Sequence, residues 1–235
     1  MTVKMVEKYM LKIRTQIATA LAIFFHVIGF VGMFFNKEFF TAATPFNLLL
    51  MFGLLLYTQQ KINVGFIIFF VVCFITGIVV EVVGTSTGYL FGEYVYGTTL
   101  GLSFKNVPLV IGINWFIIIY CSGITVHRFL EKISAKLESM TGAPPPAMRY
   151  FSLISDGAML AVFFDWIMEP AAIKLGYWQW LGDGEIPTYN YLCWFFISMG
   201  LMSVFTFLKF EKKNIFAVNL VMIMMMFFML IRTFL

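Results

Sequence analysis

Long apolar stretches recur along the chain, and short segments between them carry most of the charged residues. A stretch of about 20 apolar residues can cross a bilayer as an α-helix, which satisfies its own backbone hydrogen bonds in lipid. The pattern predicts an all-α polytopic membrane protein with about seven transmembrane helices, in a single transmembrane domain over residues 1–235. The apolar runs lie at about 16–35, 39–57, 62–83, 107–126, 150–169, 191–208 and 215–234.

The first two runs have features that qualify this prediction. Pro45 interrupts the run at 39–57, which is therefore the weakest of the seven. Residues 1–14 are basic and precede an apolar run, as in a secretory signal peptide. The run is longer than the apolar core of such a peptide, and no small-residue cleavage site follows it. We therefore expect it to remain as the first helix.

Basic residues are distributed unevenly between the connections. With the N-terminus inside, 12 of the 16 Lys and Arg residues fall in inner segments, and residues 132–148 form an inner linker. Because basic residues accumulate on the cytoplasmic side, this predicts a multi-pass protein of the cell inner (cytoplasmic) membrane, N-in and C-out. The four outer basic residues are Lys37, Lys105, Lys174 and Arg232.

Composition excludes several classes of function. Hydrophobic residues make up 61% of the chain and charged residues 12%, which leaves no segment for a soluble domain. The net charge of +4 does not indicate a nucleic-acid partner, because membrane topology explains the basic residues. The chain has no glycine-rich nucleotide loop, and its seventh run has no lysine that could hold retinal. Dinucleotide redox chemistry, ATP coupling and a rhodopsin are therefore disfavoured.

Cysteines and histidines give no support for a metal or redox site. Cys73, Cys121 and Cys193 stand alone in separate apolar runs, without CxxC spacing. His26 and His127 lie on different runs with no second ligand at metal-site spacing. We therefore expect no metal. His26 lies mid-span in the first run, where it is either an interhelical hydrogen-bonding residue or part of a pocket.

Three carboxylates interrupt these apolar runs. Glu81 ends the third run, and Asp165 and Glu169 end the fifth, so in the predicted topology all three lie in the outer third. Asp165 and Glu169 are four residues apart and share a helix face, and Pro170 then stops or bends the helix. An ionisable residue at this depth usually faces a protein interior or wet cavity and marks a functional site. The plainer interpretation is that these acids reach headgroup water.

Buried carboxyl groups suit acid–base chemistry. A carboxyl group in an apolar site holds its proton at neutral pH, because burial disfavours the charged form, and it can act as a general acid. An ionised partner can then activate water. We expect Glu81 to be the donor, because it ends an uninterrupted apolar span. Chemistry on a lipid-soluble substrate and movement of an ion or solute through a polar interior both fit these acids.

The outer connections that follow Glu81 and Pro170 are rich in glycine and aromatic residues. We expect them to fold back over the helix ends as a lid. The plainer interpretation is an aromatic belt at the membrane interface, which would account for many of these rings. Asn114 and Trp115 lie near the start of the fourth run, from where they reach the outer pocket; interhelical hydrogen bonding is their plain alternative.

Two ordered blocks of residues occupy these connections and the adjoining helix ends. The first comprises Glu81-Val-Val-Gly-Thr-Ser-Thr-Gly, Phe91-Gly-Glu93-Tyr-Val-Tyr, Leu100-Gly, Val107-Pro and Asn114-Trp115. The second comprises Asp165-Trp-Ile-Met-Glu169-Pro170-Ala, Gly176-Tyr-Trp178-Gln-Trp180, Gly184, Ile186-Pro187, Asn190-Tyr and Trp194. Over about residues 75–195 the chain resembles the carotenoid biosynthesis protein family of integral-membrane carotenoid hydratases, of the γ-carotene 1'-hydratase or bisanhydrobacterioruberin hydratase type.

The resemblance implies a hydro-lyase that adds water to the terminal C1'=C2' double bond of an acyclic end group, as in γ-carotene, lycopene or bisanhydrobacterioruberin. It implies catalysis through a tertiary carbocation by Glu81, Asp165 and Glu169, with ring faces of Tyr94, Tyr96, Trp115 or Trp194 toward the cation. No cofactor is expected. The expected partners are the carotenoid and membrane lipid. Association with other carotenoid biosynthesis enzymes is compatible with the resemblance. The expected substrate-binding residues are Glu93, Tyr94, Tyr96, Asn114, Trp115, Trp178, Asn190, Trp194 and His26.

The chain departs from the family pattern in two places. Glu169 stands where Asp is expected before the proline, and residues 184–190 lack the Tyr-Gly that usually precedes Ile/Val-Pro. These departures concern the substrate and leave the fold unaffected. Two other classes compete with hydration. A carotenoid cyclase would trap the same cation with a neighbouring double bond, and a transporter or proton channel would use the acids as a relay.

Overall fold

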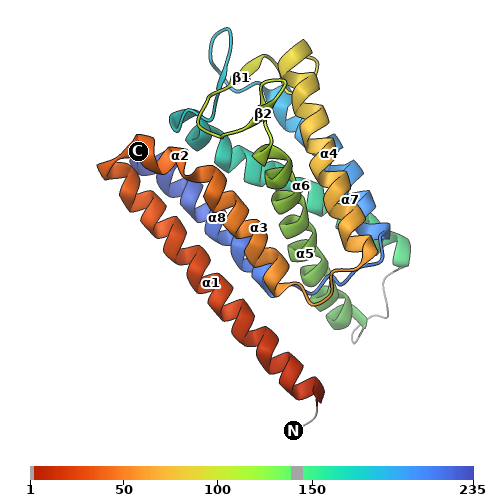
Figure 1. The fold of residues 1–235 in the computed structure, drawn as a ribbon. Helices are drawn as coiled ribbons and strands as arrows, with labels where there is room; N and C mark the ends of the chain where they lie inside the picture. The colour runs from red at the N-terminus through yellow and green to blue at the C-terminus, as the bar shows by residue number, and fades with distance from the viewer. Residues whose placement is uncertain (1–2, 139–144) are drawn as a thin grey trace.

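The computed structural model describes residues 3–138 and 145–235 and is almost entirely helical (Figure 1). The α-helices are α1 (Val3–Phe35), α2 (Lys37–Ala42), α3 (Thr44–Thr58), α4 (Val64–Thr87), α5 (Val110–Glu138), α6 (Pro146–Lys174), α7 (Thr188–Phe207) and α8 (Ile215–Phe234). Four short strands lie in the connections, namely β1 (Tyr94–Tyr96), β2 (Ser103–Phe104), β3 (Val107–Pro108) and β4 (Trp178–Trp180). The all-α prediction is confirmed.

Six of the helices in the described part of the chain are long and apolar enough to cross a membrane, and α3 is a shorter apolar helix. The predicted run at 39–57 is divided at Ala43 into α2 and α3, with Pro45 in the first turn of α3. A proline is tolerated there because a first-turn N–H has no partner within the helix. Together with α3 these helices number seven, and the two termini lie at opposite ends of the bundle (Figure 1).

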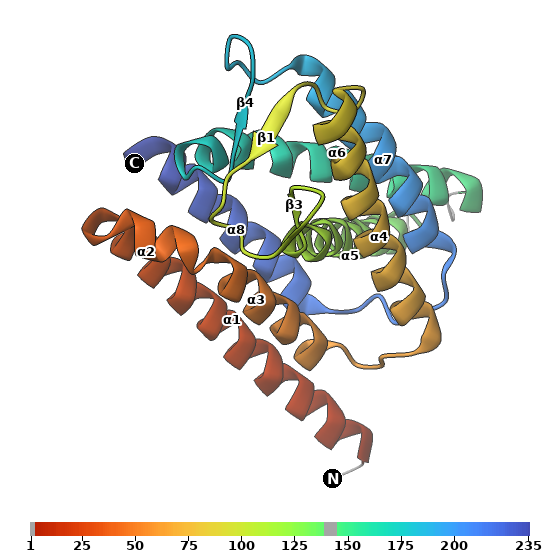
Figure 2. The same ribbon diagram turned by 45° about the horizontal axis from the view of Figure 1, so that its top comes forward.

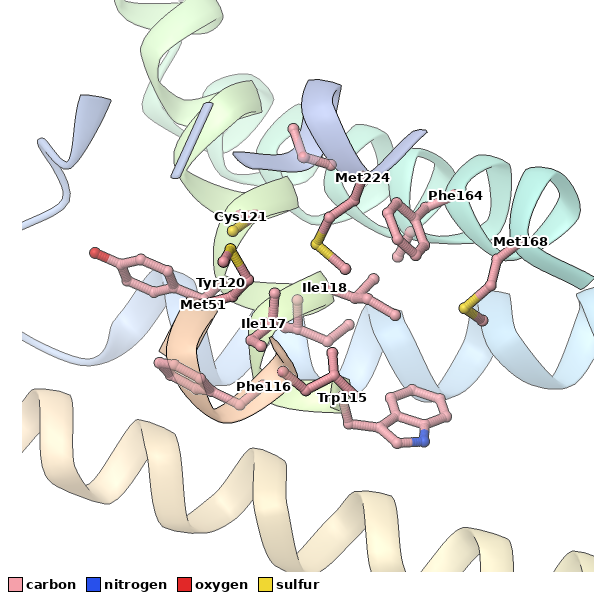
Figure 3. Packing of buried hydrophobic residues seen from close by; sticks show 14 of the residues in the cluster. Met51, Trp115, Phe116, Ile117, Ile118, Tyr120, Cys121, Phe164, Met168 and Met224 are labelled. Atoms are coloured by element: carbon pink, nitrogen blue, oxygen red, sulfur yellow. The ribbon is translucent and has the colours of Figure 1, made fainter. Parts of the chain in front are cut away.

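Helix α5 is the centre of the bundle, and Figure 2 shows it nearly end-on with other helices around it. Its most apolar window is 83% buried, whereas the corresponding windows of the other five long helices are 28–44% buried. A helix that is apolar on all sides is suited to such a position. Its side chains pack in several directions, with Trp115, Ile118 and Tyr120 among those drawn in Figure 3.

Two helices extend well beyond the apolar runs predicted for them. Helix α1 begins at Val3, where the apolar run was expected from residue 16, and α5 continues to Glu138, where the run was expected to end near residue 126. Both extensions contain Lys, Arg, Glu and Leu, which favour helix without requiring an apolar environment. Residues 139–144 of the predicted inner linker lie outside the described residues.

The connections that follow α4 and α6 pair with each other through an antiparallel ribbon of β1 and β4. Beside the ribbon, Gly97 N donates to Tyr177 O at 2.8 Å. The approach there is close, since a Cβ at Gly97 would lie 2.2 Å from Gly176 O. The ribbon brings segments far apart in the sequence together over the ends of α4 and α6 (Figure 2). It was not foreseen as sheet structure, although folding of these connections over the helix ends was expected.

Candidate active site

Glu81 accepts three hydrogen bonds from aromatic side chains. It lies on α4 with 6% of its surface exposed. Tyr94 and Tyr96 of β1 donate their hydroxyls to Oε2 at 2.5 and 2.7 Å. Trp115 of α5 donates its Nε1–H to Oε1 at 3.0 Å. Donors from two separate elements therefore fix the orientation of this carboxyl group.

Two glycines of α4 leave room for these donors. A Cβ at Gly77 would lie 2.7 Å from the Trp115 ring, and a Cβ at Gly84 would lie 2.8 Å from Tyr94 Oη. Gly77 is four residues before Glu81 and Gly84 is three residues after it, so both lie on the same face of α4 as Glu81. A side chain at either position would displace a ring that donates to this acid.

Among the described residues, only N–H groups donate to Glu169. Trp178 and Trp180 of β4 donate their Nε1–H groups to Oε2 at 3.0 and 3.1 Å. Asn190 of α7 donates from Nδ2 to Oε1 at 3.4 Å. An N–H group cannot accept a hydrogen bond, so a proton on either oxygen of Glu169 would meet another donor. The surroundings therefore suit a carboxylate ion.

Asp165 has one oxygen that is not engaged. It is 1% exposed, and Asn190 donates from Nδ2 to its Oδ2 at 2.9 Å. Its buried Oδ1 has no hydrogen-bond partner among the described residues. Because Asn190 reaches Asp165 and Glu169 from the same nitrogen, the two acids lie on one face of α6, as their spacing predicts. A proton on Oδ1 would meet no competing donor.

The β1–β4 ribbon presents four of these donors from one face. Residues opposite each other in the ribbon are Tyr94 and Trp180, and Tyr96 and Trp178. Alternate residues of a strand point to the same side, so the intervening residue of each strand turns outward and is exposed. The tyrosines serve Glu81 and the tryptophans serve Glu169, so one ribbon orients carboxyl groups from two helices.

A small cavity of about 30 Å³ lies between the three acids. A water molecule needs about 10–15 Å³ of such space, so the cavity has room for one or two waters. A molecule larger than this volume can enter only if the lining moves. The lining residues are Glu81, Phe91, Tyr94, Tyr96, Ile111, Asn114, Trp115, Asp165, Met168, Glu169, Trp178, Trp180, Asn190 and Trp194.

Two of the lining tryptophans stack on each other. The ring centroids of Trp115 and Trp194 are 3.9 Å apart, with 8° between the ring planes. Each ring therefore covers one face of its neighbour. Only the outer face of each ring is therefore left to contact a cation, as was expected of Trp115 or Trp194.

The tyrosine hydroxyls of β1 are held in their neutral form. Burial, reinforced by the negative charge of Glu81, raises the pKa of Tyr94 and of Tyr96 well above the ordinary value of 10.0. A neutral hydroxyl can donate or accept a hydrogen bond, unlike an indole N–H. Glu81 is therefore the acid whose neighbours can adapt if it gains or loses a proton.

The chemistry that this arrangement supports is proton transfer. In the described part of the chain, no group of three or more His, Cys, Asp or Glu residues is placed to hold a metal ion. N–H and O–H donors already approach the oxygens of Glu81 and Glu169. Three carboxyl groups in different hydrogen-bonding environments instead offer both a proton donor and a proton acceptor.

The structure brings most of the predicted site residues together. The three acids line the cavity, and so do the expected substrate-binding residues Tyr94, Tyr96, Asn114, Trp115, Trp178, Asn190 and Trp194.

Two of the residues expected to bind substrate lie outside the cavity. Glu93 precedes β1 and is exposed, because its position alternates with that of the inward-facing Tyr94. His26 is buried on α1, where its Nδ1 lies 2.7 Å from Ala22 O and its ring contacts Phe227 of α8. These contacts within α1 and with α8 explain why the His26 side chain is buried, and no substrate contact is needed.

Four lining residues were not foreseen, namely Phe91, Ile111, Met168 and Trp180. A signal for Trp180 was present, because it stands two residues after Trp178 and would share its face in a strand. Met168 is three residues after Asp165 and lies on the same helical face. For Phe91 and Ile111 the sequence offers no comparable signal, since chain segments distant in sequence bring them to the cavity.

Comparison with protein families gives one match. A family model described as carotenoid biosynthesis protein matches residues 42–235. This range includes every element that contributes to the cavity, while α1 lies outside it. Comparison with curated proteins gives no match, and comparison with solved structures gives none either.

Proposed function

The chain belongs to the carotenoid biosynthesis protein family, and we propose that it is a carotenoid hydratase. The reaction adds water to the terminal C1'=C2' double bond of an acyclic end group, of the γ-carotene, lycopene or bisanhydrobacterioruberin type, and gives a tertiary alcohol. The observation that carries the proposal is a water-sized cavity between three buried carboxyl groups of different hydrogen-bonding character.

Asp165 is the proton donor in this proposal. Hydration requires an acid whose proton can reach carbon 2' of the alkene, and Oδ1 of Asp165 is the carboxyl oxygen without a protein partner. The π-electron pair forms the new C–H bond, and the electrons of the O–H bond remain on Asp165. This assignment revises our expectation that Glu81 is the donor, because both oxygens of Glu81 already accept hydrogen bonds.

Glu81 is the proton acceptor. Water attacks the tertiary cation at carbon 1' and releases a proton, which Glu81 can take on Oε2 if a tyrosine hydroxyl turns from donor to acceptor. Transfer of this proton back to Asp165 through a second water restores the resting state. Water is added without a change in oxidation state, so the reaction needs no redox cofactor.

Glu169 remains ionised throughout. Its N–H donors disfavour protonation, so it supplies a fixed negative charge near the developing carbocation. The aromatic rings around the cavity exclude bulk water and add cation–π attraction, which is of order 2 kcal/mol for a desolvated ring. Each proposed role is therefore based on the hydrogen bonds that the acid makes in the structure.

Expression in carotenoid-producing bacteria tests the proposal. The expected result is a pigment heavier by one water than the acyclic precursor, detected by mass analysis of the extracted carotenoids. A product of unchanged mass with a new ring would indicate a cyclase. Unchanged pigment with proton or solute movement across the membrane would indicate a transporter.

A further inference from the structure

A second pocket lies at the opposite end of the bundle from the acids. It has a volume of about 410 Å³, within the range of small-molecule sites. It forms where α5, the start of α6, the end of α7 and the α7–α8 connection meet, at the lower end in Figure 1. The side chains that matter here are His127, Arg149 and Lys212, with Tyr150 and Leu153 as the apolar part of the wall. The pocket is independent of the proposed function.

Lys212 is a half-buried cation without a carboxylate partner. Its Nζ donates to Thr206 O at 3.1 Å and to Leu208 O at 3.0 Å, at the C-terminal end of α7. Among the described residues, no carboxylate lies within 4.0 Å of it. Burial lowers the pKa of Lys212, which reflects the cost of holding this charge away from water. These carbonyls engage two of the three N–H donors of the ammonium group, and its Nζ also lies 5.2 and 5.1 Å from the ring centroids of Phe205 and Phe210.

Arg149 and His127 share a single acid at long range. Arg149 Nη2 and His127 Nδ1 each lie 3.9 Å from a carboxylate oxygen of Glu131. These separations are too long for hydrogen bonds. Nδ1 of His127 is buried and has no hydrogen-bond partner in the described part of the chain. Arg149, which is exposed and lines the pocket, is therefore only weakly engaged by the protein.

The charge around the pocket is positive. The charged groups that act on His127 are Glu131, Lys212, Arg149 and Lys213. Three cations against one carboxylate favour an anion in the space between them. Membrane topology alone would place basic residues at this end of the bundle. Hydrogen bonds to the carbonyls at the end of α7 explain part of the position of Lys212. Neither explanation requires Arg149 and Lys212 to line the same pocket, as they do.

We propose that this pocket binds the phosphate of an anionic phospholipid headgroup. Arg149 and Lys212 donate to the phosphate oxygens. A lipid is favoured over a soluble anion because the pocket lies at the ends of membrane-spanning helices, where headgroups lie. Tyr150 and Leu153 provide an apolar wall beside the cations for the glycerol and upper acyl chain.

Lipid binding to the purified full-length protein in detergent tests this assignment. The probes are dimyristoylphosphatidylglycerol, dimyristoylphosphatidylcholine and inorganic phosphate, with bound lipid counted by native mass spectrometry. We expect phosphatidylglycerol to bind about tenfold more tightly than phosphatidylcholine, and Arg149→Gln to remove about that tenfold preference. Arg149 is the main variant because its side chain is 40% exposed, so its replacement leaves the core intact. Lys212→Gln is the second variant and should have the same effect.

Lys213→Gln is the matched control. It removes the same charge one residue away, at an exposed position that does not line the pocket. An equal loss of preference in Lys213→Gln and Arg149→Gln would show general attraction to basic residues and overturn the proposal. Equal binding of the two lipids would also overturn it. Displacement of phosphatidylglycerol by an equal concentration of inorganic phosphate would identify a free anion as the ligand and overturn the lipid assignment.

Discussion

Asp165 and Glu81 are both buried acids with different hydrogen bonds, and the proposed mechanism gives them different roles. Asp165→Asn keeps the size of the side chain and its contact with Asn190 while removing the transferable proton. We expect it to lower the rate of hydration by about 10²-fold or more, the usual contribution of general acid catalysis. Product formation per amount of membrane protein measures this. Asp156→Asn makes the same change at an exposed position of α6 and should leave the rate unchanged. Near-normal turnover in Asp165→Asn would return the donor role to Glu81.

Tyr94 and Tyr96 should resist ionisation in alkaline solution. Because their pKa values are raised, the folded protein keeps protons that the unfolded chain loses above about pH 10. Their contribution to stability is therefore constant below that pH and falls as the pH rises beyond it. In an absorbance titration at about pH 11, the wild type and the Tyr94→Phe/Tyr96→Phe double variant should show the same number of ionised tyrosines. An excess of two in the wild type would mean that the hydroxyls are exposed.

Individual site residues could be predicted where their chemistry conflicts with their surroundings. Glu81, Asp165 and Glu169 were identified because acids in apolar runs are costly. The functions of Gly77 and Gly84 were not identified, because the need for a small residue appears only when Trp115 and Tyr94 are placed beside them. The distribution of hydrogen-bond donors among the three acids likewise depends on tertiary structure, so the sequence did not separate their roles.

The β1–β4 ribbon is the element on which the geometry of the acids depends. In Gly97→Ala the new methyl group would lie 2.2 Å from Gly176 O, which is backbone and cannot move aside alone. We expect the ribbon to separate locally and the rate of hydration to fall about tenfold or more as donors to Glu81 and Glu169 shift. The amount of protein in the membrane should be unchanged.

Gly200→Ala is the control for this change. Gly200 lies within α7, and a Cβ there meets nothing within 4 Å. Both variants replace glycine by alanine, so a difference in hydration assays between them reports on the ribbon. Full activity in Gly97→Ala would show that the ribbon does not hold the acids in their working positions.

Prediction of elements succeeded where apolar periodicity is strong and local. The long helices were predicted from their apolar runs, and Pro45 correctly marked the weak second run that divides into α2 and α3. The ribbon was missed because its two strands are only three residues each and lie far apart in the sequence. The polar extensions of α1 and α5 were missed because hydropathy does not report helix outside the apolar run.

At the scale of the whole molecule, the charge distribution predicts its orientation in the membrane. We propose that the protein lies in the cell inner membrane with its N-terminus in the cytoplasm. A reporter fused after Arg149 should then be cytoplasmic, and one fused after Leu235 should lie outside. Reporters that respond only on one side of the membrane measure this. The opposite placement of either reporter would reverse the orientation or change the number of spans.

Substrate entry depends on several helices and on the ribbon together. The cavity accommodates water but is smaller than a carotenoid end group. The proposed reaction therefore requires the arrangement of helices and ribbon to open during each turnover. The sequence predicted a lid over the acids, but the size of the enclosed space depends on packing between α4, α5, α6 and α7, which hydropathy does not define.

In the proposed reaction, solvent water is added across a carbon–carbon double bond at the three acids. The most direct measurement is the isotope content of the product formed in membranes suspended in water that carries deuterium and heavy oxygen. Our account predicts one solvent deuterium bonded to carbon 2' and one solvent oxygen on carbon 1' of each hydrated end group. Product oxygen derived from molecular oxygen, or solvent deuterium incorporated without oxygen, would contradict it.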